Sequence, residues 1–399
     1  MAIFDKFQEL AQTRRMLQES GIDSIHVVMD EIVSPTEAVV NGRGMILAGT
    51  NNYLGLTFDS ACIEAACDAA RKQGTGTTGS RVANGSYSNH VELERELADF
   101  FDCRGVIVFS TGYVANLGML AGLTQPGDAL LIDADCHASI YDGCRLSGAD
   151  IFRFRHNDPQ DLDKRLRRLG DRASNTVIVV EGIYSMFGDR APLAEFVEVK
   201  DRYGAYLLVD EAHSLGVLGE HGRGRAEEAG VLDKVDFIVG TFSKSLGAIG
   251  GYCASNHPEL DLVRYAARPY VFTASPSPST IASTRAALEQ LRSRPELRHR
   301  LWENAGRLYE GLQGLGFELS PEPSPIVAVR LPSREEAVMS WLELIERGVY
   351  VNLVLPPGTP DGGSLLRCSV SAGHTSQQID SICEAFKSLQ QRAHTAETA

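Results

Sequence analysis

The stretch Gly240-Thr-Phe-Ser-Lys-Ser-Leu-Gly-Ala-Ile-Gly-Gly251 decides how the rest of this chain is interpreted. It follows the apolar run Val235-Asp-Phe-Ile-Val239, which predicts a short buried strand. Lys244 stands among small hydroxyl residues and is followed by glycines. In isolation, a Ser-Lys pair of this kind is usually an ordinary surface lysine in a loop. A lysine in a partly desolvated pocket, however, loses part of its preference for the charged form, and its amine becomes a nucleophile.

The residues around this lysine suggest what such a nucleophile would attack. An unprotonated lysine condenses with an aldehyde to give a Schiff base. The hydroxyls of Thr241 and Ser243 could hold a phosphate next to that aldehyde. An aldehyde beside a phosphate is the chemistry of pyridoxal 5'-phosphate (PLP), which we therefore predict as the cofactor.

Composition excludes several other classes of protein. The chain has 399 residues, of which 43% are hydrophobic and 23% charged, as in ordinary globular proteins of two or three packed units. Its net charge of −14 disfavours nucleic acid as a partner. The eight cysteines form no C-x-x-C pair, so neither a disulfide framework nor a metal site is expected. No apolar run approaches the roughly 18 residues of a membrane span, and the N-terminus lacks a signal-peptide core. We therefore expect a cytoplasmic protein.

Strand and helix patterns alternate through the middle of the chain. Strands are predicted at 105–109, 129–133, 151–154, 176–180, 205–209 and 237–239, with helical patterns between them. Continuous apolar strands separated by helices indicate an α/β fold, with a mostly parallel sheet covered on both faces. In such sheets, ligands bind outside the carboxyl ends of the strands.

The two ends of the chain have a different character. Residues 3–18 have the spacing of an amphipathic helix, and residues 25–48 predict short strands around an Asn41-Gly42 turn. Beyond residue 275, helices and a few strands predict a smaller α+β domain. We divide the chain into an N-terminal helix with short strands (1–48), a large cofactor-binding domain (49–275) and a C-terminal small domain (276–399).

One glycine-rich motif is misleading. Gly74-Thr-Gly-Thr-Thr-Gly79 matches G-x-G-x-x-G, but the dinucleotide fingerprint needs a strand before it and a helix opening at it. Here a helical pattern precedes it and a loop follows. A glycine loop that lines a site, or a simple connection, fits this sequence better.

Polar residues follow four of the predicted strands, where a parallel sheet would bring them together. These residues are Gly112 and Tyr113 after 105–109, His137 after 129–133, Asp210 and His213 after 205–209, and Thr241, Ser243 and Lys244 after the last strand. Taken alone, Asp210 could equally be a helix cap, and a single histidine is more often structural. Asp210-Glu-Ala-His213 also spells a helicase box, but the chain has no Walker A loop.

Together these residues supply what PLP chemistry requires. A carboxylate, Asp210, would keep the pyridine nitrogen protonated, which makes the ring an electron sink. His213 could reach the phenolic oxygen, and His137 could stack on the ring face. Lys244 would form the Schiff base, and the start of the helix at Gly112 and Tyr113 would bind the phosphate.

Several longer motifs carry a resemblance to a known family. The motifs are Asp210-Glu-Ala-His213-Ser-Leu-Gly216, Gly222-Arg-Gly224 and Thr241-Phe-Ser-Lys244-Ser. They resemble the α-oxoamine synthases, and the likeness runs from Asn51-Asn-Tyr-Leu-Gly55 to Arg367-Cys-Ser369. The resemblance implies the PLP fold type I (aspartate aminotransferase-like) architecture and a homodimer. It also implies a decarboxylative condensation of an amino acid with an acyl thioester.

Other stretches resemble one branch of that family most, the soluble bacterial members that use L-serine and a long-chain acyl-CoA. Among these stretches are Phe109-Ser-Thr-Gly-Tyr113 and Arg268-Pro-Tyr-Val-Phe-Thr-Ala-Ser275. The implied product is 3-ketodihydrosphingosine, formed in the first step of sphingolipid biosynthesis. Lys244 would also be the general base at the serine Cα.

The same resemblance implies further site residues. Arg367 would bind the substrate carboxylate, together with Asn52, His137 and Ser80, and Ser185 would contact the cofactor. Thr273 and Ala274 would reach the cofactor from the neighbouring subunit.

Several alternatives stay open at this point. The chain could be a sister synthase that uses alanine, glycine or another acyl thioester, and the acyl carrier could be a carrier protein. The chain could also be a PLP aminotransferase or lyase, which predicts transfer of an amino group to a keto acid and no release of CoA. A regulatory relative should lack the Schiff-base lysine. The amphipathic N-terminal helix leaves a peripheral membrane contact open, but no membrane span.

Overall fold

The central feature of the fold is a seven-stranded sheet. The computed structural model describes residues 3–19, 27–356 and 358–397. The strand order is β4-β10-β9-β8-β7-β5-β6. The strands are β4 (Gly105–Phe109), β5 (Ala129–Asp133), β6 (Asp150–Phe154), β7 (Thr176–Glu181), β8 (Tyr206–Asp210), β9 (Phe237–Thr241) and β10 (Gly251–Ser255).

All the predicted strands of this sheet are present and parallel to one another, and β10 alone runs antiparallel, between β4 and β9. Each residue of β5, β7 and β9 is buried, which explains their nearly unbroken apolar sequences. Strand β10 was not predicted, because Gly251-Tyr-Cys-Ala-Ser255 continues a glycine-rich loop and has little β-branched character.

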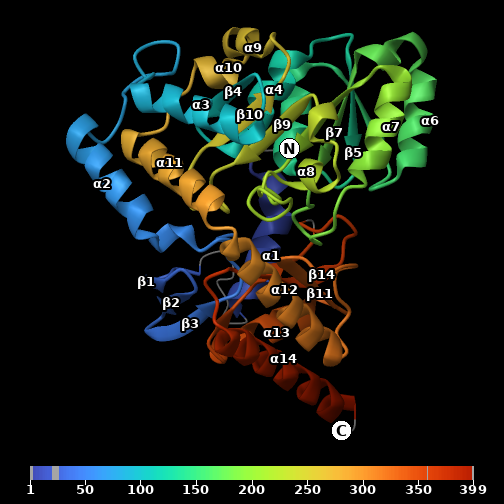
Figure 1. Ribbon diagram of the computed structural model, residues 1–399. Coiled ribbons are helices and arrows are strands. Elements are labelled where there is room, and N and C mark those ends of the chain that lie inside the picture. The colour runs from blue at the N-terminus through green and yellow to red at the C-terminus, as the bar shows by residue number, and fades with distance from the viewer. Residues whose placement is uncertain (1–2, 20–26, 357, 398–399) are drawn as a thin grey trace.

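Helices connect these strands and pack around the sheet (Figure 1). In chain order they are α2 (Ser60–Gln73), α3 (Ser88–Phe101), α4 (Gly112–Leu123), α5 (Ala138–Ser147), α6 (Pro159–Leu169), α7 (Leu193–Tyr203), α8 (Arg225–Glu228), α9 (Leu260–Ala266), α10 (Arg268–Val271) and α11 (Pro278–Ser293). The described residues also contain four 3₁₀ turns, which are η1 (Asp5–Phe7), η2 (Leu56–Phe58), η3 (Gly170–Asn175) and η4 (Leu232–Lys234).

Side-chain caps fix where three of these helices begin. Asp59 accepts from the amide of Ala61 at 3.0 Å at the start of α2, and Thr111 accepts from the amide of Val114 at 3.0 Å at the start of α4. Asp158 caps α6, where Pro159 occupies the first turn. Because α4 begins directly after β4, its N-terminal amides lie at the carboxyl edge of the sheet.

The smaller lobe combines both ends of the chain (Figure 1). One sheet has the order β11-β14-β13, and the other has the order β1-β2-β3-β12. The elements are α1 (Gln8–Glu19), β1 (Glu31–Ser34), β2 (Glu37–Val40), β3 (Arg43–Leu47), α12 (Glu296–Gly314), β11 (Ile326–Leu331), α13 (Arg334–Glu346), β12 (Val349–Tyr350), β13 (Asn352–Val354), β14 (Ser364–Ser369) and α14 (Ser376–Glu397).

The N-terminal strands share a sheet with a C-terminal one, since β3 pairs in parallel with β12 through Ile46 and Leu47. The predicted turn between β2 and β3 is present: Asn41 and Gly42 have φ angles of 50° and 73°, as a type I′ turn requires. We keep the division at residues 48/49 and 275/276 as a proposal, although β3 of the first segment pairs with β12 of the third.

The glycine motif at residues 74–79 follows α2 and leads through turns to α3. This placement agrees with the rejection of a dinucleotide fingerprint. Of the predicted N-terminal helix, the described part carries exposed apolar side chains at Ile3, Phe4 and Leu10. Within residues 3–19, 27–356 and 358–397, no helix is long and apolar enough to cross a membrane.

Candidate active site

A cavity of about 290 Å³ lies at the carboxyl ends of the parallel strands. Its walls come from the ends of β7, β8 and β9 and from the first turns of α4 and α5. Eight of the predicted site residues line it: Gly112, Tyr113, His137, Asp210, His213, Thr241, Ser243 and Lys244. The rule that neighbouring parallel strands end at one edge therefore located these residues correctly in space.

Lys244 lies just beyond β9, half-buried in the wall of this cavity. Burial lowers the pKa of its amine to about 8, against the opposing effects of Asp210 and Glu181. An amine with this pKa is partly unprotonated near neutral pH. A partly unprotonated amine at this position is what the predicted roles of nucleophile and base would require.

Asp210 is held rigidly at the end of β8, where it is 5% exposed. Its Oδ2 accepts from Asn116 Nδ2 at 2.7 Å, and its Oδ1 accepts from the amide of Ala212 at 2.9 Å. Asn116 belongs to α4 and was not predicted. Its Oδ1 is buried without a partner among the described residues. The site therefore presents a fixed carboxylate and an unused amide oxygen.

Glu181, at the end of β7, is a second buried carboxyl group that the sequence analysis missed. It pairs in register with Asp210, and burial, reinforced by the charge of Asp210, raises its pKa well above the ordinary value. Its Oε1 accepts from the backbone amide of His137. An apolar strand that ends in Glu was the only available signal, and it is a weak one.

His137 caps α5 and projects from the same edge of the sheet. Its Nδ1 accepts from the amide of Ser139 at 3.2 Å and lies 2.8 Å from the hydroxyl of Ser139. Burial lowers the pKa of its imidazole. The ring lies edge-on to Tyr113, with 6.4 Å between the centroids. Since the capping bond fixes the ring, a flat ligand could pack against a neutral imidazole.

The start of α4 and the residues beside it are suited to an anion. Gly112 opens α4, and a side chain there would place its Cβ 2.7 Å from the Cβ of Thr241. The hydroxyls of Thr241 and Ser243 lie 2.9 Å apart beside this helix start. Hydroxyls and helical amides together form a phosphate site. The residues present thus fit PLP, with phosphate donors at one end and Asp210 and Lys244 in the same cavity.

In the wall of the cavity, His213 contacts a residue that the sequence analysis did not assign. Its Nδ1 lies 2.7 Å from the hydroxyl of Tyr53. Burial lowers the pKa of His213 well below its ordinary value and raises the pKa of Tyr53 to about 12. The pair is therefore neutral, which leaves His213 Nε2 as the atom available to a ligand.

Arg367 on β14 is 5% exposed and is held by several oxygens. Nε donates to the carbonyl of Ser185 at 2.6 Å, and Nη1 donates to Ser369 Oγ at 2.9 Å. Both terminal nitrogens also reach Asn51 Oδ1, at 3.3 and 3.2 Å. The predicted Asn52 instead donates to Thr57 Oγ1, and its Oδ1 has no partner among the described residues. Asn51, rather than Asn52, thus contacts the arginine.

The other predicted residues do not line the cavity. Ser185 acts through its carbonyl on Arg367. Ser80 lies in the glycine loop, and Thr273 and Ala274 lie in the segment that docks onto this loop. Ser275 donates its backbone amide to Gly79 at 3.0 Å and contacts Thr77. Within this chain, Ser80, Thr273 and Ala274 do not line the cavity that contains Lys244.

A buried cluster supports two of the loops around the site. His156 Nδ1 lies 2.8 Å from Asp133, at the end of β5, and its Nε2 lies 2.7 Å from Asp189, beyond β7. A neutral imidazole has only one N–H, so two carboxylate partners require the charged ring. These aspartates raise the pKa of His156 to about 10, against desolvation. The ring thus joins the segment before His137 to the loop that carries Ser185.

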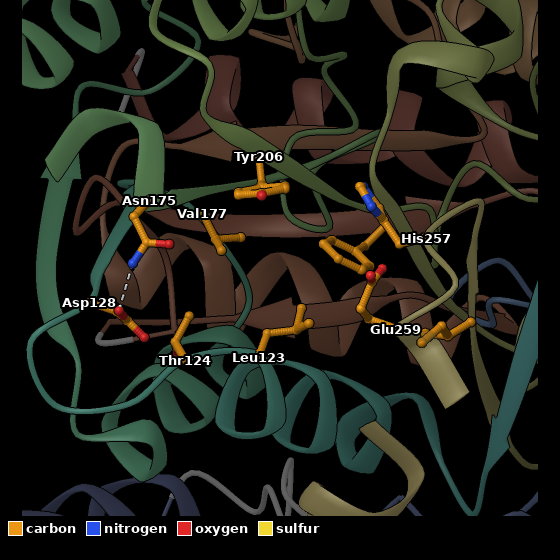
Figure 2. A pocket seen from close by; sticks show the side chains of 10 residues that line it. Leu123, Thr124, Asp128, Asn175, Val177, Tyr206, His257 and Glu259 are labelled. Atoms are coloured by element: carbon orange, nitrogen blue, oxygen red, sulfur yellow. Dashed lines mark hydrogen bonds between the residues drawn. The ribbon is translucent and has the colours of Figure 1, made fainter. Parts of the chain in front are cut away.

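A second cavity, of about 240 Å³, lies at the opposite edge of the sheet (Figure 2). It collects residues at the amino ends of β5, β7, β8 and β9, among them Asp128, Asn175, Tyr206 and Phe237, together with His257. It contains no lysine, and none of the predicted site residues lines it.

The comparisons with known proteins agree with the site at the carboxyl edge. The family model "Aminotransferase class I and II" matches residues 43–386. The serine palmitoyltransferase of Caulobacter vibrioides is 57% identical to the chain, over 97% of this chain and 96% of that protein. A solved high-resolution structure of SPT with the PLP internal aldimine has a TM-score of 0.96 and 48% identity, and the match covers 98% of this chain and 99% of the other.

The chain belongs to the α-oxoamine synthase family. A more distant relative is the 8-amino-7-oxononanoate synthase of Alkaliphilus metalliredigens, 38% identical over 96% of this chain and 98% of that protein. The predicted family, fold type I architecture and PLP dependence are confirmed by these matches. The α-oxoamine synthases are PLP-dependent acyltransferases, which agrees with the lysine of lowered pKa and the buried carboxylate in this cavity.

Proposed function

We propose that this α-oxoamine synthase condenses L-serine with a long-chain acyl-CoA such as palmitoyl-CoA. The reaction would release carbon dioxide and CoA and give 3-ketodihydrosphingosine, which opens sphingolipid biosynthesis. The observation that carries the proposal is the 57% identity with a serine palmitoyltransferase over 97% of the chain. Lys244, Asp210 and His213 line one cavity. Burial, together with the charge of Arg367, lowers the pKa of Lys244 and of His213, which supports the proposal.

When bound, PLP supplies an electron sink for the negative charge that develops at the serine Cα. The Arg367 guanidinium is the group that would hold the serine carboxylate, in place of its present contact with Asn51. The Lys244 amine would take the proton from Cα and return it after carbon dioxide leaves. Asp210, fixed by Asn116, is the carboxylate that would keep the pyridine nitrogen protonated.

The neutral groups have positioning roles in this scheme. His137, held by its capping bond, would orient the substrate against the cofactor ring and donate to the carboxylate. His213, held by Tyr53, would face the phenolic oxygen. Gly112, Tyr113, Thr241 and Ser243 are the residues that would bind the phosphate.

The deciding experiment is mass spectrometry of the product after incubation with serine and palmitoyl-CoA. We expect one product with the mass of 3-ketodihydrosphingosine and one CoA released for each product formed. Parallel incubations with alanine and glycine test the sister-synthase alternative, which the 38% identity with an 8-amino-7-oxononanoate synthase keeps in view. Turnover of alanine or glycine in preference to serine would refute the serine assignment.

We also propose that the protein is a cytoplasmic homodimer. Thr273, Ala274 and Ser80 lie away from the cavity of their own chain, as residues contributed to a neighbouring site would. Nearby, Leu262, Tyr265 and Phe272 are large apolar side chains with exposed fractions of 65%, 78% and 74%. Sedimentation of the holoenzyme should give twice the chain mass, and Phe272→Asp should weaken the dimer. A fully active monomer would refute this assembly.

A further inference from the structure

A third cavity, of about 470 Å³, lies between α3, α12 and the segment around residue 222. Three arginines line it: Arg223, Arg292 and Arg298. Arg223 is the centre of the Gly222-Arg-Gly224 motif, which the proposed reaction does not use. No salt bridge links any of these arginines to a carboxylate within the described part of the chain, although most other arginines of this acidic protein are paired.

Arg298 is the unusual member of this group. Arg298 is only 7% exposed. The guanidinium donates to two backbone carbonyls, those of Glu220 and Leu291, the latter at 3.4 Å. A side chain at Gly222 would place its Cβ 3.1 Å from Nη1 of Arg298, so the glycine leaves room for the guanidinium. Burial lowers the pKa of Arg298.

Arg223 lines the same cavity and, like Arg298, has no salt bridge to a described carboxylate. Its Nε is buried and has no hydrogen-bond partner among the described residues. The guanidinium stands over Phe100, 5.9 Å from the ring centroid. The charge of Glu227, whose side chain is 13% exposed, acts on Arg298, but Glu227 already binds the His221 ring at 2.6 Å and the backbone amide of Arg223 at 2.9 Å.

A buried cation without a hydrogen-bonded carboxylate is costly, and an anion that binds it offsets this cost. Asp99 and Glu220 also line the cavity, but both are exposed residues, whose charges water and salt screen. The buried charge at Arg298 is screened much less, so the positive groups dominate. Guanidinium forks match phosphate oxygens in pairs, which a chloride ion cannot use.

We propose that this cavity binds a small, multiply charged phosphate ligand, either a phosphate monoester or a diphosphate. Arg298 and Arg223 hold the phosphate oxygens, and Arg292 adds charge at the rim. The volume of about 470 Å³ suits a small ester.

The first test is calorimetric titration of the PLP-loaded protein with inorganic pyrophosphate and, separately, with inorganic phosphate. We expect saturable binding of pyrophosphate at one site per chain. Arg298→Met and Arg223→Gln should each weaken it by about tenfold or more, because each removes charge-assisted hydrogen bonds. Arg300→Gln, an exposed arginine on the same helix, is the matched control and should change the affinity by less than about twofold.

The absence of saturable binding would overturn the proposal. So would unchanged affinity in Arg223→Gln, or an equal loss in Arg300→Gln. Arg223→Gln and Arg292→Gln keep the test decisive if Arg298→Met fails to fold.

A second arm separates two sources of the phosphate and, unlike the first, rests on the proposed function. If CoA displaces pyrophosphate and Arg223→Gln raises KM for palmitoyl-CoA while KM for serine stays unchanged, the phosphates are those of the acyl donor. If pyrophosphate binds and KM for palmitoyl-CoA stays unchanged, the ligand is a free phosphate compound. Because binding of pyrophosphate needs no turnover, failure of the site and failure of the proposed reaction are distinguishable.

Discussion

The two edges of the central sheet carry cavities of similar size and very different chemistry. The cavity at the carboxyl edge measures about 290 Å³ and the one at the amino edge about 240 Å³. At the carboxyl edge, burial displaces the pKa values of Lys244, His213 and Glu181. At the amino edge, Asp128 pairs with Asn175 at 2.8 Å (Figure 2), and His257 pairs with Asp236 at 2.9 Å.

The difference follows from chain direction. At the carboxyl edge, strands end and helices begin, so loops place side chains next to free helical amides. Helix α4 extends from one cavity to the other. It begins at Gly112, in the wall of the first cavity, and ends at Leu123, in the wall of the second. Size alone therefore does not identify an active site. Buried ionisable groups with displaced pKa values at the carboxyl edge indicate one.

The largest expected effect comes from Lys244→Ala, which would remove the chemistry from the carboxyl edge. CoA release should fall by at least about 10²-fold, because proton transfer at Cα loses its base. The visible absorbance of bound PLP should change at the same time, as measured by absorption spectroscopy. Lys234→Ala, an exposed lysine before β9, is the control and should retain full activity. An active Lys244→Ala protein would contradict the assignment.

Arg367→Ala should act on substrate binding and leave the cofactor in place. Hydrogen bonds to a charged group are worth about 1.5–3 kcal/mol, so KM for serine should rise by about 10- to 100-fold. Steady-state kinetics with PLP content measured in parallel test this expectation. Arg330→Ala, on the neighbouring strand β11, should leave KM unchanged. If Arg367→Ala bound serine normally, the carboxylate role would be wrong.

The His156→Gln variant tests whether a charged His156 stabilises the loops at the carboxyl edge. The quantity to follow is the pH dependence of the folding stability. The pKa of His156 is raised from 6.5 to about 10 in the folded protein. Its contribution to stability is therefore complete below pH 6.5 and is lost as the pH rises through about 10. That contribution is on the order of a few kcal/mol. Urea midpoints of the wild type should fall across this window, and those of His156→Gln should be lower at pH 6.5 and flatter above it. Parallel profiles would refute the charged bridge.

His257→Ala, at the amino edge, should have the smallest effect. It removes one hydrogen bond to Asp236 and the stacking on Phe237, where the ring centroids are 5.3 Å apart. We expect a loss of about 1 kcal/mol in stability and turnover within about twofold of the wild type. Denaturant unfolding and the CoA-release assay check both values. A large loss of turnover with intact folding would show that the two edges are coupled, and would break the comparison.

Much of the site could be predicted from sequence because strand ends were recognisable. Apolar runs located β4, β5, β8 and β9 to within about two residues, and parallel strands end at one edge. The sequence therefore predicted that the side chains of His137, Asp210 and Lys244 lie close together. Asn116 and Glu181 were missed, because their local sequences look like an ordinary helix turn and an ordinary strand end.

Other features could not be predicted because they depend on distant pairing. The antiparallel strand β10 and the pairing of β3 with β12 join segments whose local patterns carry no sign of their partners. Likewise, no sequence pattern indicated that Asn51 would contact Arg367, 316 residues away, or that Arg298 would be buried without a carboxylate.

The sequence by itself determined the strand–helix order, the reactive lysine and the set of polar residues at the strand ends, because these depend on local periodicity and residue chemistry. Only the tertiary structure decided which of these groups are desolvated, which neighbours hold them, and which chain segments share a sheet. Desolvation and long-range contact depend on the packing of the whole chain. They shift the pKa of an amine such as that of Lys244, which no local motif can do.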